Sequence, residues 1–326
     1  MPRNSHKMAG VVVAAALALT ACSSGGSSDS GGAGGGGGKN VKIGVSFYSN
    51  VIPLYIQMKQ GMEDKAKELG VQTEFAYGDN SAETQSNQIN TFVTKGVNLV
   101  LASPVDAAAL VPAYKQARSA GVPMISVANK VADADEDAYV GPDLVDQAAR
   151  TMQKVIDGMG GSGDLMLVTG PPQITFVQLQ KQGWDQVLAK NPKVHVVTTL
   201  VDNDLSTGAA VNLATTGLAS NKGVKGILSS DDDISMGVIQ AVQSAGINPK
   251  DIFIAGWDGS PAAIAALKAG TYDLTLSERG YTWGQIAMQT AVDYANGKKP
   301  AQHRINVPDV FIDQQNVNTL TPEQIR

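Results

Sequence analysis

Few residues of this chain are suited to acid–base or nucleophilic catalysis. Among 326 residues there are three histidines, and only His195 and His303 lie beyond the first forty positions. The sequence has no His-Glu-x-x-His metal-binding motif and no Gly-x-Ser-x-Gly nucleophile turn. The Gly160–Gly163 turn precedes a strand-like run, whereas a dinucleotide-binding loop follows a strand and opens a helix. We therefore predict that the chain is not an enzyme and uses no cofactor.

One run of acidic residues has the density of a metal-binding loop. The run Asp133–Asp137 reads DADED, as the start of a calcium loop would. However, Ala138 stands where such a loop needs glycine, and Leu144 stands at its twelfth position, where a glutamate binds the ion. We interpret the run as a solvated acidic loop and predict no metal site.

The first forty residues have the pattern of an exported protein. Arg3 and Lys7 precede an apolar run, residues 8–19, that is too short to span a bilayer but suits the core of a signal peptide. The run ends in Leu19-Thr20-Ala21-Cys22, which looks like a bacterial lipobox and holds the only cysteine of the chain. We predict a signal peptide at residues 1–21 and lipid attachment at Cys22. An ordinary secretory signal with an incidental cysteine is the alternative.

A stretch of glycine and serine follows this cysteine. Residues 23–38 read SSGGSSDSGGAGGGGG, and a chain of this composition is a flexible coil. Its root-mean-square reach is roughly 5–6 Å times the square root of its length. We predict that residues 22–40 tether a folded body to the extracytoplasmic face of the cell membrane.

Charge and composition limit the partners of the body. The formal net charge is -5 at pH 7, and no run of lysine or arginine provides the basic footprint that nucleic acid binding normally needs. After the signal segment, no apolar stretch reaches the length of a membrane span. An apolar content of 43% is that of a globular protein. We expect a monomer that binds no nucleic acid.

Short apolar runs alternate with longer amphipathic segments along the body. The runs expected to be strands are Val41–Phe47, Val71–Tyr77, Val97–Ala102, Val122–Val127, Asp164–Thr169, Val194–Leu200, Gly226–Ser229, Ile252–Ala255 and Leu274–Ser277. The expected helices are Pro53–Leu69, Ala82–Lys95, Asp106–Ala120, Pro142–Met159, Phe176–Lys190, Thr207–Ser220, Ile234–Ala245 and Pro261–Ala269. This alternation indicates parallel sheets buried on both faces. We predict two doubly wound α/β lobes, with a ligand beyond the carboxyl ends of their strands.

Several segments follow one another in a distinctive order. They are GMEDKAKELG, GVNLVLASPVDAAAL, AGVPMISVAN, KGILSSDDDISMGVIQAVQSAG and IFIAGWDGSPAAIAALKAG, and GWDGSP is the most specific of these words. In order and spacing, they resemble the ribose-binding family of periplasmic solute-binding proteins, which are the type I, sugar-type binding subunits of ABC importers. The resemblance covers about residues 41–313.

This resemblance implies an architecture and a function. It implies two lobes joined by three crossings, near Gly141–Asp143, Ser277–Arg279 and Val307–Asp309. The N-terminal lobe would comprise residues 41–142 and 279–307, and the C-terminal lobe residues 143–278 and 308–326. The lobes would close on a sugar or related solute and deliver it to an ABC permease. Presentation of the ligand to a membrane sensor or chemoreceptor stays open as the alternative.

By the same resemblance, three acids occupy ligand-binding positions. Asp258, in GWDGSP, stands where an aspartate accepts hydrogen bonds from ligand hydroxyls, although it could instead cap the following helix. Asp231 stands where relatives usually carry asparagine followed by aspartate, and one residue of Asp231–Asp233 is expected to cap the helix that starts near Ile234. Glu278 stands where the family commonly has glutamine, with a solvated surface acid as the alternative.

The resemblance implies five further ligand-binding positions, at which this chain has residues other than those usual in the family. Tyr55 is expected to stack on the ligand, helped by Tyr48, and a core tyrosine is the alternative. Asn129 falls in the loop where relatives often have Asp-Arg. Gln180 stands at the position of a second arginine, and Asn203 at that of a second aromatic residue.

These departures shape the expected ligand. The pocket would have three acids and several amides, and it would lack both of the family's arginines. Buried carboxylates need compensation, which could come from ligand hydroxyls, from Lys130 and Arg279, or from a cationic ligand. We hypothesise a neutral monosaccharide or acyclic polyol, with an aminated version as a further alternative. A glycosidase with Asp231 and Asp258 as its carboxylate pair remains a remote one.

Overall fold

The computed structural model describes residues 41–47 and 49–325. The predicted signal peptide, the tether, Cys22 and Tyr48 lie outside these residues. Across the described ranges, every helix is too short or too polar to cross a lipid bilayer.

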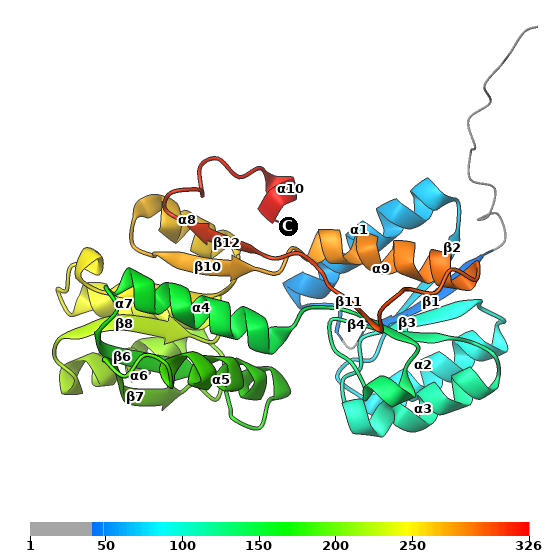
Figure 1. The fold of residues 1–326 in the computed structure, drawn as a ribbon, viewed down its shortest axis with the longest axis horizontal. Helices are drawn as coiled ribbons and strands as arrows, with labels where there is room; N and C mark the ends of the chain where they lie inside the picture. Colours follow the sequence, from blue (N-terminus) through cyan, green and yellow to red (C-terminus); the bar gives the residue numbers. More distant parts are fainter. Residues whose placement is uncertain (1–40, 48, 326) are drawn as a thin grey trace, which may run out of the picture. The chain divides into compact units, whose positions relative to one another are not determined.

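The first sheet has six strands. They are β1 (Lys42–Phe47), β2 (Gln72–Tyr77), β3 (Leu99–Ala102), β4 (Met124–Val127), β5 (Ala138–Val140) and β11 (Arg304–Ile305). The strands are all parallel and lie in the order β11-β5-β4-β3-β1-β2 (Figure 1). Both β3 and β4 are buried along their whole length, which is typical of strands covered by helices on both faces.

Four helices cover this sheet, and the last of them comes from far along the chain. They are α1 (Pro53–Leu69), α2 (Ala82–Thr94), α3 (Ala107–Ser119) and α9 (Gly280–Ala295). Helix α1 packs on α9, and α2 packs on α3 (Figure 1). The first pair needs glycine: a Cβ atom on Gly61 would lie 2.0 Å from the Tyr281 carbonyl oxygen, and one on Gly284 would lie 2.0 Å from that of Met58.

The second sheet also has six strands. They are β6 (Gly163–Thr169), β7 (Val194–Val201), β8 (Val224–Ser229), β9 (Phe253–Asp258), β10 (Leu274–Ser277) and β12 (Val310–Asp313). Their order is β12-β10-β9-β8-β6-β7, and only the edge strand β12 runs antiparallel to its neighbour.

The remaining helices lie along the second half of the chain. They are α4 (Leu144–Gly158), α5 (Thr175–Leu188), α6 (Thr207–Ser220), α7 (Asp232–Ser244), α8 (Pro261–Ala269) and α10 (Pro322–Ile325), with short 3₁₀ turns η1 (Asp133–Asp135) and η2 (Pro249–Asp251). Helix α4 packs on α5, and α6 packs on α7. The prediction of two α/β lobes built on parallel sheets is confirmed, and the antiparallel edge strand was not expected.

The chain passes between the two sheets in three segments. Residues 141–143 join β5 to α4, residues 278–279 join β10 to α9, and residues 306–309 join β11 to β12. Side chains bond to these segments: Arg304 Nη1 lies 2.7 Å from Asp143 Oδ2, and Arg150 pairs with Asp309. Trp283 Nε1 donates to the Pro308 carbonyl oxygen at 2.7 Å.

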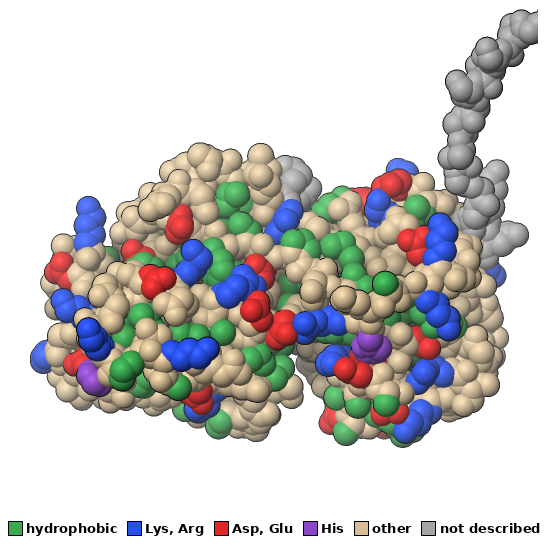
Figure 2. Space-filling view, viewed as in Figure 1, with side chains coloured by type: hydrophobic (Ala, Val, Ile, Leu, Met, Phe, Trp, Pro, Cys, Tyr) green, Lys and Arg blue, Asp and Glu red, His purple; other side chains and the backbone are tan. Residues whose placement is uncertain are grey.

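The charged side chains on the face drawn in Figure 2 are of both signs and are interspersed. Pairs of opposite charge along single helices, such as Lys65 with Glu68 and Lys181 with Asp185, also mix the two signs on the protein surface. Exposed pairs of this kind typically contribute less than about 1 kcal/mol each. This face therefore has no large patch of one sign.

Candidate functional site

The predicted site residues of the second sheet follow the ends of its strands. Glu278 follows β10, Asp258 is the last residue of β9, Asp231 lies two residues after β8, and Asn203 lies two residues after β7. Because these strands are parallel, their carboxyl ends share one edge of the sheet. In the strand register, Asp258 stands opposite Ser277, the residue before Glu278. We call this the acid edge.

Asp258 has the most unusual surroundings at the acid edge. Its backbone has a φ of 110°, a region that side chains other than glycine rarely adopt. The residue is exposed, yet desolvation by the surrounding protein is the largest cause that raises the pKa of its carboxyl well above the usual value. Protein atoms therefore crowd the carboxyl, although water reaches part of the residue. Helix α8 is capped by Ser260, which accepts from Ala263 N, so Asp258 is not its cap.

Asp232 is a buried acid that the sequence interpretation missed. Only 1% of it is exposed. Its Oδ1 accepts hydrogen bonds from the hydroxyls of Tyr272 and Thr275, both at 2.9 Å, and its Oδ2 accepts from Ser260 N at 2.8 Å. Burial raises its pKa to about 7, despite these donors. Asp232 thus ties α7 to β10 and to the start of α8, and its charge in turn raises the pKa of Asp258.

Asp231 is itself the N-cap of α7. Its Oδ1 accepts a hydrogen bond from Ile234 N at 2.8 Å. Burial is the main cause that raises its pKa to about 6, and the charges of Asp233 and Asp202 add to the effect. Capping uses one carboxylate oxygen of Asp231, so the cap and a ligand contact are compatible roles.

Glu278 is half-buried, and the pKa of its carboxyl is raised to about 7, chiefly by burial. The indole N–H of Trp257 partly offsets this rise. Trp257 Nε1 is buried and has no hydrogen-bond partner within bonding distance among the described residues. The N–H of Trp257 in β9 therefore acts on the Glu278 carboxyl, directly after β10, from outside full hydrogen-bond geometry.

The amide candidates of the second sheet have different environments. Gln180, in α5, is fully buried, and its Nε2 donates to the Ser230 carbonyl oxygen at 2.9 Å. Its Oε1 has no partner in the described part of the chain. Asn203 is exposed. Its neighbour Asp202 is fully buried and accepts from Ser206 N at 3.2 Å, so it shapes the loop after β7.

Two candidates beside the first sheet, Tyr55 in α1 and Asn129 after β4, lie together. Tyr55 is 3% exposed, and its ring packs on Phe47 with centroids 5.2 Å apart. Its hydroxyl lies 2.9 Å from Ser103 Oγ and accepts from Asn129 Nδ2 at 3.3 Å. The ring therefore lies in the core, and it is the hydroxyl that reaches the loops after β3 and β4. Stacking of this ring on a ligand would require the tyrosine to move.

Lys130, a candidate for offsetting the charge of the buried carboxyls, pairs with a different acid. Lys130 Nζ pairs with Asp133 and lies 5.4 Å from the centre of the Tyr139 ring. The pKa of Asp258 is raised instead by three neighbouring acids, which are Asp232, Glu278 and Asp231. Carboxyls in this state can accept hydrogen bonds from hydroxyls and, when protonated, donate them.

These raised pKa values predict that the ligand-free protein loses stability as the pH rises from about 5 to 7. Folded Asp232 and Glu278 keep their protons up to about pH 7, whereas such groups in an unfolded chain release them near pH 4. Between these limits the folded state binds more protons, so the free energy of unfolding falls with rising pH. One pKa unit corresponds to about 1.4 kcal/mol.

Urea unfolding at several pH values between 5 and 8 measures this dependence, which should level off above pH 7. The variant Asp232→Asn should have a flatter profile. Stability that rises steadily across the range would contradict these acid environments.

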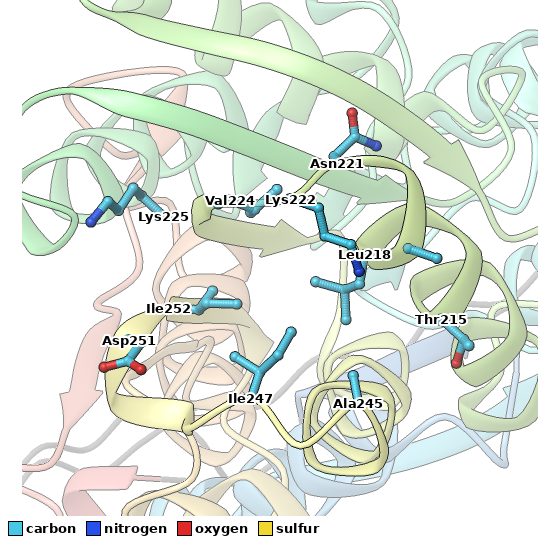
Figure 3. A pocket seen from close by; sticks show the side chains of 12 residues that line it. Thr215, Leu218, Asn221, Lys222, Val224, Lys225, Ala245, Ile247, Asp251 and Ile252 are labelled. Carbon is cyan, nitrogen blue, oxygen red and sulfur yellow. The ribbon is translucent and has the colours of Figure 1, made fainter.

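A large hollow of the second sheet lies away from the acid edge. It has a volume of about 570 Å³ (Figure 3). Its lining includes Leu218, Val224, Ile247 and Ile252, with the charged residues Lys222, Lys225 and Asp251. Val224 is the first residue of β8, and Ile252 directly precedes β9. The hollow is therefore at the amino ends of the strands, and we do not assign the ligand to it.

The chain is similar to known proteins over most of its length. The periplasmic binding protein domain matches residues 43–299. The chain is 29% identical over 240 residues to a xylitol-binding protein of Mycolicibacterium smegmatis, covering 73% of this chain and 68% of that protein. It is 25% identical over 273 residues to a ribose import binding protein of Bacillus subtilis, covering 83% and 86%.

A solved structure extends the comparison to three dimensions. The crystal structure of a periplasmic ribose ABC transporter from Conexibacter woesei has a TM-score of 0.81 and 27% identity to this chain. The match covers 87% of this chain and 96% of that one, so it includes both sheets.

Proposed function

The chain belongs to the periplasmic binding protein family, and we propose that it is the solute-binding subunit of an ABC importer for a monosaccharide or a polyol. The observation that carries this proposal is the group of carboxyls at the acid edge, Asp231, Asp258 and Glu278. Hydroxyls of a ligand can donate to these groups, and a hydrogen bond to a charged group contributes about 1.5–3 kcal/mol. Similarity to proteins that bind xylitol and ribose supports the same ligand class.

The acid edge favours a neutral ligand over an anion. The charges of three neighbouring acids, Asp232, Glu278 and Asp231, raise the pKa of Asp258 there. An anionic ligand would add a further negative charge to a site where protein already replaces water, and like charges in such a place repel strongly. A sugar or polyol brings hydroxyl donors without charge. An aminated polyol, which brings a positive charge as well, is the variant that these acids would also accept.

Binding is proposed to couple to lobe closure. The two lobes, residues 41–142 with 279–307 and residues 143–278 with 308–326, would move about the segments 141–143, 278–279 and 306–309. The C-terminal lobe would contribute the acid edge with Gln180 and Asn203, and the N-terminal lobe Asn129 and the Tyr55 hydroxyl. Ligand that contacts both lobes favours the closed form by its difference in affinity for the two forms. The closed form would then dock on an ABC permease.

The location follows from the N-terminal sequence. We propose that Cys22 carries lipid and that residues 22–40 hold the body at the extracytoplasmic face of the cell membrane, where the permease is also found. The body is proposed to act as a monomer, without catalytic activity.

A thermal-shift screen tests the ligand class. Purified protein is heated with neutral monosaccharides, sugar alcohols, aminated polyols and sugar acids in parallel. A ligand present at about 100 times its Kd stabilises the folded state by about 2.7 kcal/mol, so the natural ligand should raise Tm by several degrees. We expect this from a neutral sugar or polyol. Stabilisation by sugar acids alone would refute the proposal, and recovery of a hydrolysed ligand would support a glycosidase instead.

A further inference from the structure

A second group of polar side chains lies where the loop before β5 meets β11. Asp133 begins the turn η1, Glu136 directly follows this turn, and His303 directly precedes β11. Strand β11 pairs with β5, and Tyr139 N donates to the His303 carbonyl oxygen at 2.9 Å. The fold therefore brings distant parts of the chain together. One carboxylate or imidazole atom from each of Asp133, Glu136 and His303 lies within 4.8 Å of the other two.

The Glu136 carboxylate in this group is buried and poorly satisfied. Only 3% of the residue is exposed, and neither of its oxygens has a described donor within hydrogen-bond distance and angle. The Ser126 hydroxyl and the Val131 N–H interact with this carboxylate only outside those limits. Its Oε1 lies 3.7 Å from His303 Nε2, and this nitrogen is also buried without a hydrogen-bond partner in residues 41–47 and 49–325. A carboxylate and an imidazole nitrogen in this position are costly unless something binds both of them.

The spacing of these atoms suits a shared metal ion. Bond lengths of about 2.0–2.2 Å to nitrogen and oxygen place neighbouring ligand atoms of a tetrahedral ion roughly 3.3 Å apart. The 3.7 Å between Glu136 and His303 is near this value and is too long for a hydrogen bond. Asp133 is exposed, so it provides a third ligand on the side from which an ion and water can enter.

We propose that Asp133, Glu136 and His303 bind one Zn²⁺ ion. One imidazole nitrogen with two carboxylates is a ligand set that suits zinc, whereas Ca²⁺ and Mg²⁺ prefer oxygen ligands alone. Water would complete the coordination. The ion would link the η1 loop to the residue that precedes β11. This strand leads into the segment 306–309. No loop motif in the sequence indicates this site, because His303 lies far along the chain from Asp133 and Glu136.

A lysine occupies part of the proposed site in the absence of metal. Lys130 Nζ pairs with Asp133, and thus supplies the positive charge that the ion would bring. Zinc has to displace this ammonium group from Asp133. Removal of the lysine is therefore expected to strengthen zinc binding, which a purely structural role of Asp133 would not predict.

Titration calorimetry of chelator-treated protein with ZnCl₂ tests the proposal. We expect one equivalent of Zn²⁺ to bind, and CaCl₂ to give no binding at this site. Loss of an outer partner of a metal ligand typically costs 10–100-fold in affinity, so His303→Ala and Glu136→Gln should each weaken binding by at least about tenfold. The matched control is His195→Ala, which removes an exposed histidine in β7 and should change nothing. Lys130→Met should bind zinc several-fold more tightly than the parent.

The proposal fails if the parent binds no zinc, or if His195→Ala abolishes binding while His303→Ala preserves it. Circular dichroism of each metal-free variant checks folding. If His303→Ala does not fold, Glu136→Gln decides, because it keeps the shape of the side chain. Unchanged affinity in that variant would also overturn the proposal.

Discussion

Replacing Asp258 with asparagine is expected to weaken binding of the natural sugar or polyol about 100-fold. Asp258 is the last residue of β9, and the charges of three other acids act on its carboxyl. Loss of a hydrogen bond to a charged group costs about 1.5–3 kcal/mol, and about 2.7 kcal/mol corresponds to a hundredfold change in Kd. Asparagine tolerates a positive φ better than most residues, so the backbone at this position should be kept. Isothermal titration with the ligand from the thermal-shift screen measures the effect.

Asp251→Asn is the matched control for this variant. Asp251 is an exposed aspartate of η2, two residues before β9, so it lies near the opposite end of the same strand. Its replacement makes the same change from carboxyl to amide and should leave Kd within about twofold of the parent. If Asp258→Asn bound as tightly as Asp251→Asn, the acid edge would not be the binding site.

Replacing Asp232 with alanine is expected to lower the free energy of unfolding by about 3 kcal/mol or more. The substitution leaves the Thr275 hydroxyl and the backbone N–H of Ser260 without their acceptor. It also removes one of the two partners of the Tyr272 hydroxyl, which keeps Ser235 Oγ at 3.1 Å. Each buried donor that loses its partner costs about 1–3 kcal/mol. A loss of this size corresponds to a fall in Tm of about 5 °C or more in a folded body of this length. Urea unfolding at pH 5 measures it, because folded Asp232 is protonated there and charge burial adds little.

The neighbouring Asp233 provides the control for stability. Asp233 is exposed in the first turn of the same helix, α7, so Asp233→Ala should change the free energy of unfolding by only about 0.5 kcal/mol. Equal stability of Asp232→Ala and Asp233→Ala would show that the network of three donors contributes nothing. A fall in the free energy of unfolding in Asp232→Ala alone would instead show that the hydrogen bonds of this acid stabilise the fold.

Most of the fold could be predicted because its central strands are buried on both faces. Continuous apolar runs marked β1 to β4 and β6 to β10 with errors of a few residues at their ends. Strands β5 and β11, with three and two residues, are too short to show any periodicity. Helix α9 begins at Gly280, and Arg279 at its N-cap makes no capping hydrogen bond with its side chain, so no start signal marks the helix. Its place against α1 depends on the close approach at Gly61 and Gly284, which only tertiary contacts reveal.

The sequence could predict only those site residues that directly follow the ends of the strands. Asp231, Asp258 and Glu278 share one edge because their strands are parallel neighbours. Nothing in the run Asp231–Asp233 indicates that its middle member turns inward to meet Tyr272. The burial of the Tyr55 ring likewise depends on Phe47, which lies on another element. Whether these residues bind the ligand stays a prediction.

The most direct test is a crystal structure of the protein with the ligand that co-purifies with it or emerges from the screen. We predict a neutral polyhydroxy molecule whose oxygens lie about 2.5–3.0 Å from Asp258 and from at least one of Asp231 and Glu278. A ligand bound elsewhere, for example in the hollow at the amino ends of β8 and β9, or a ligand that meets the acid edge without any hydroxyl, would contradict this account.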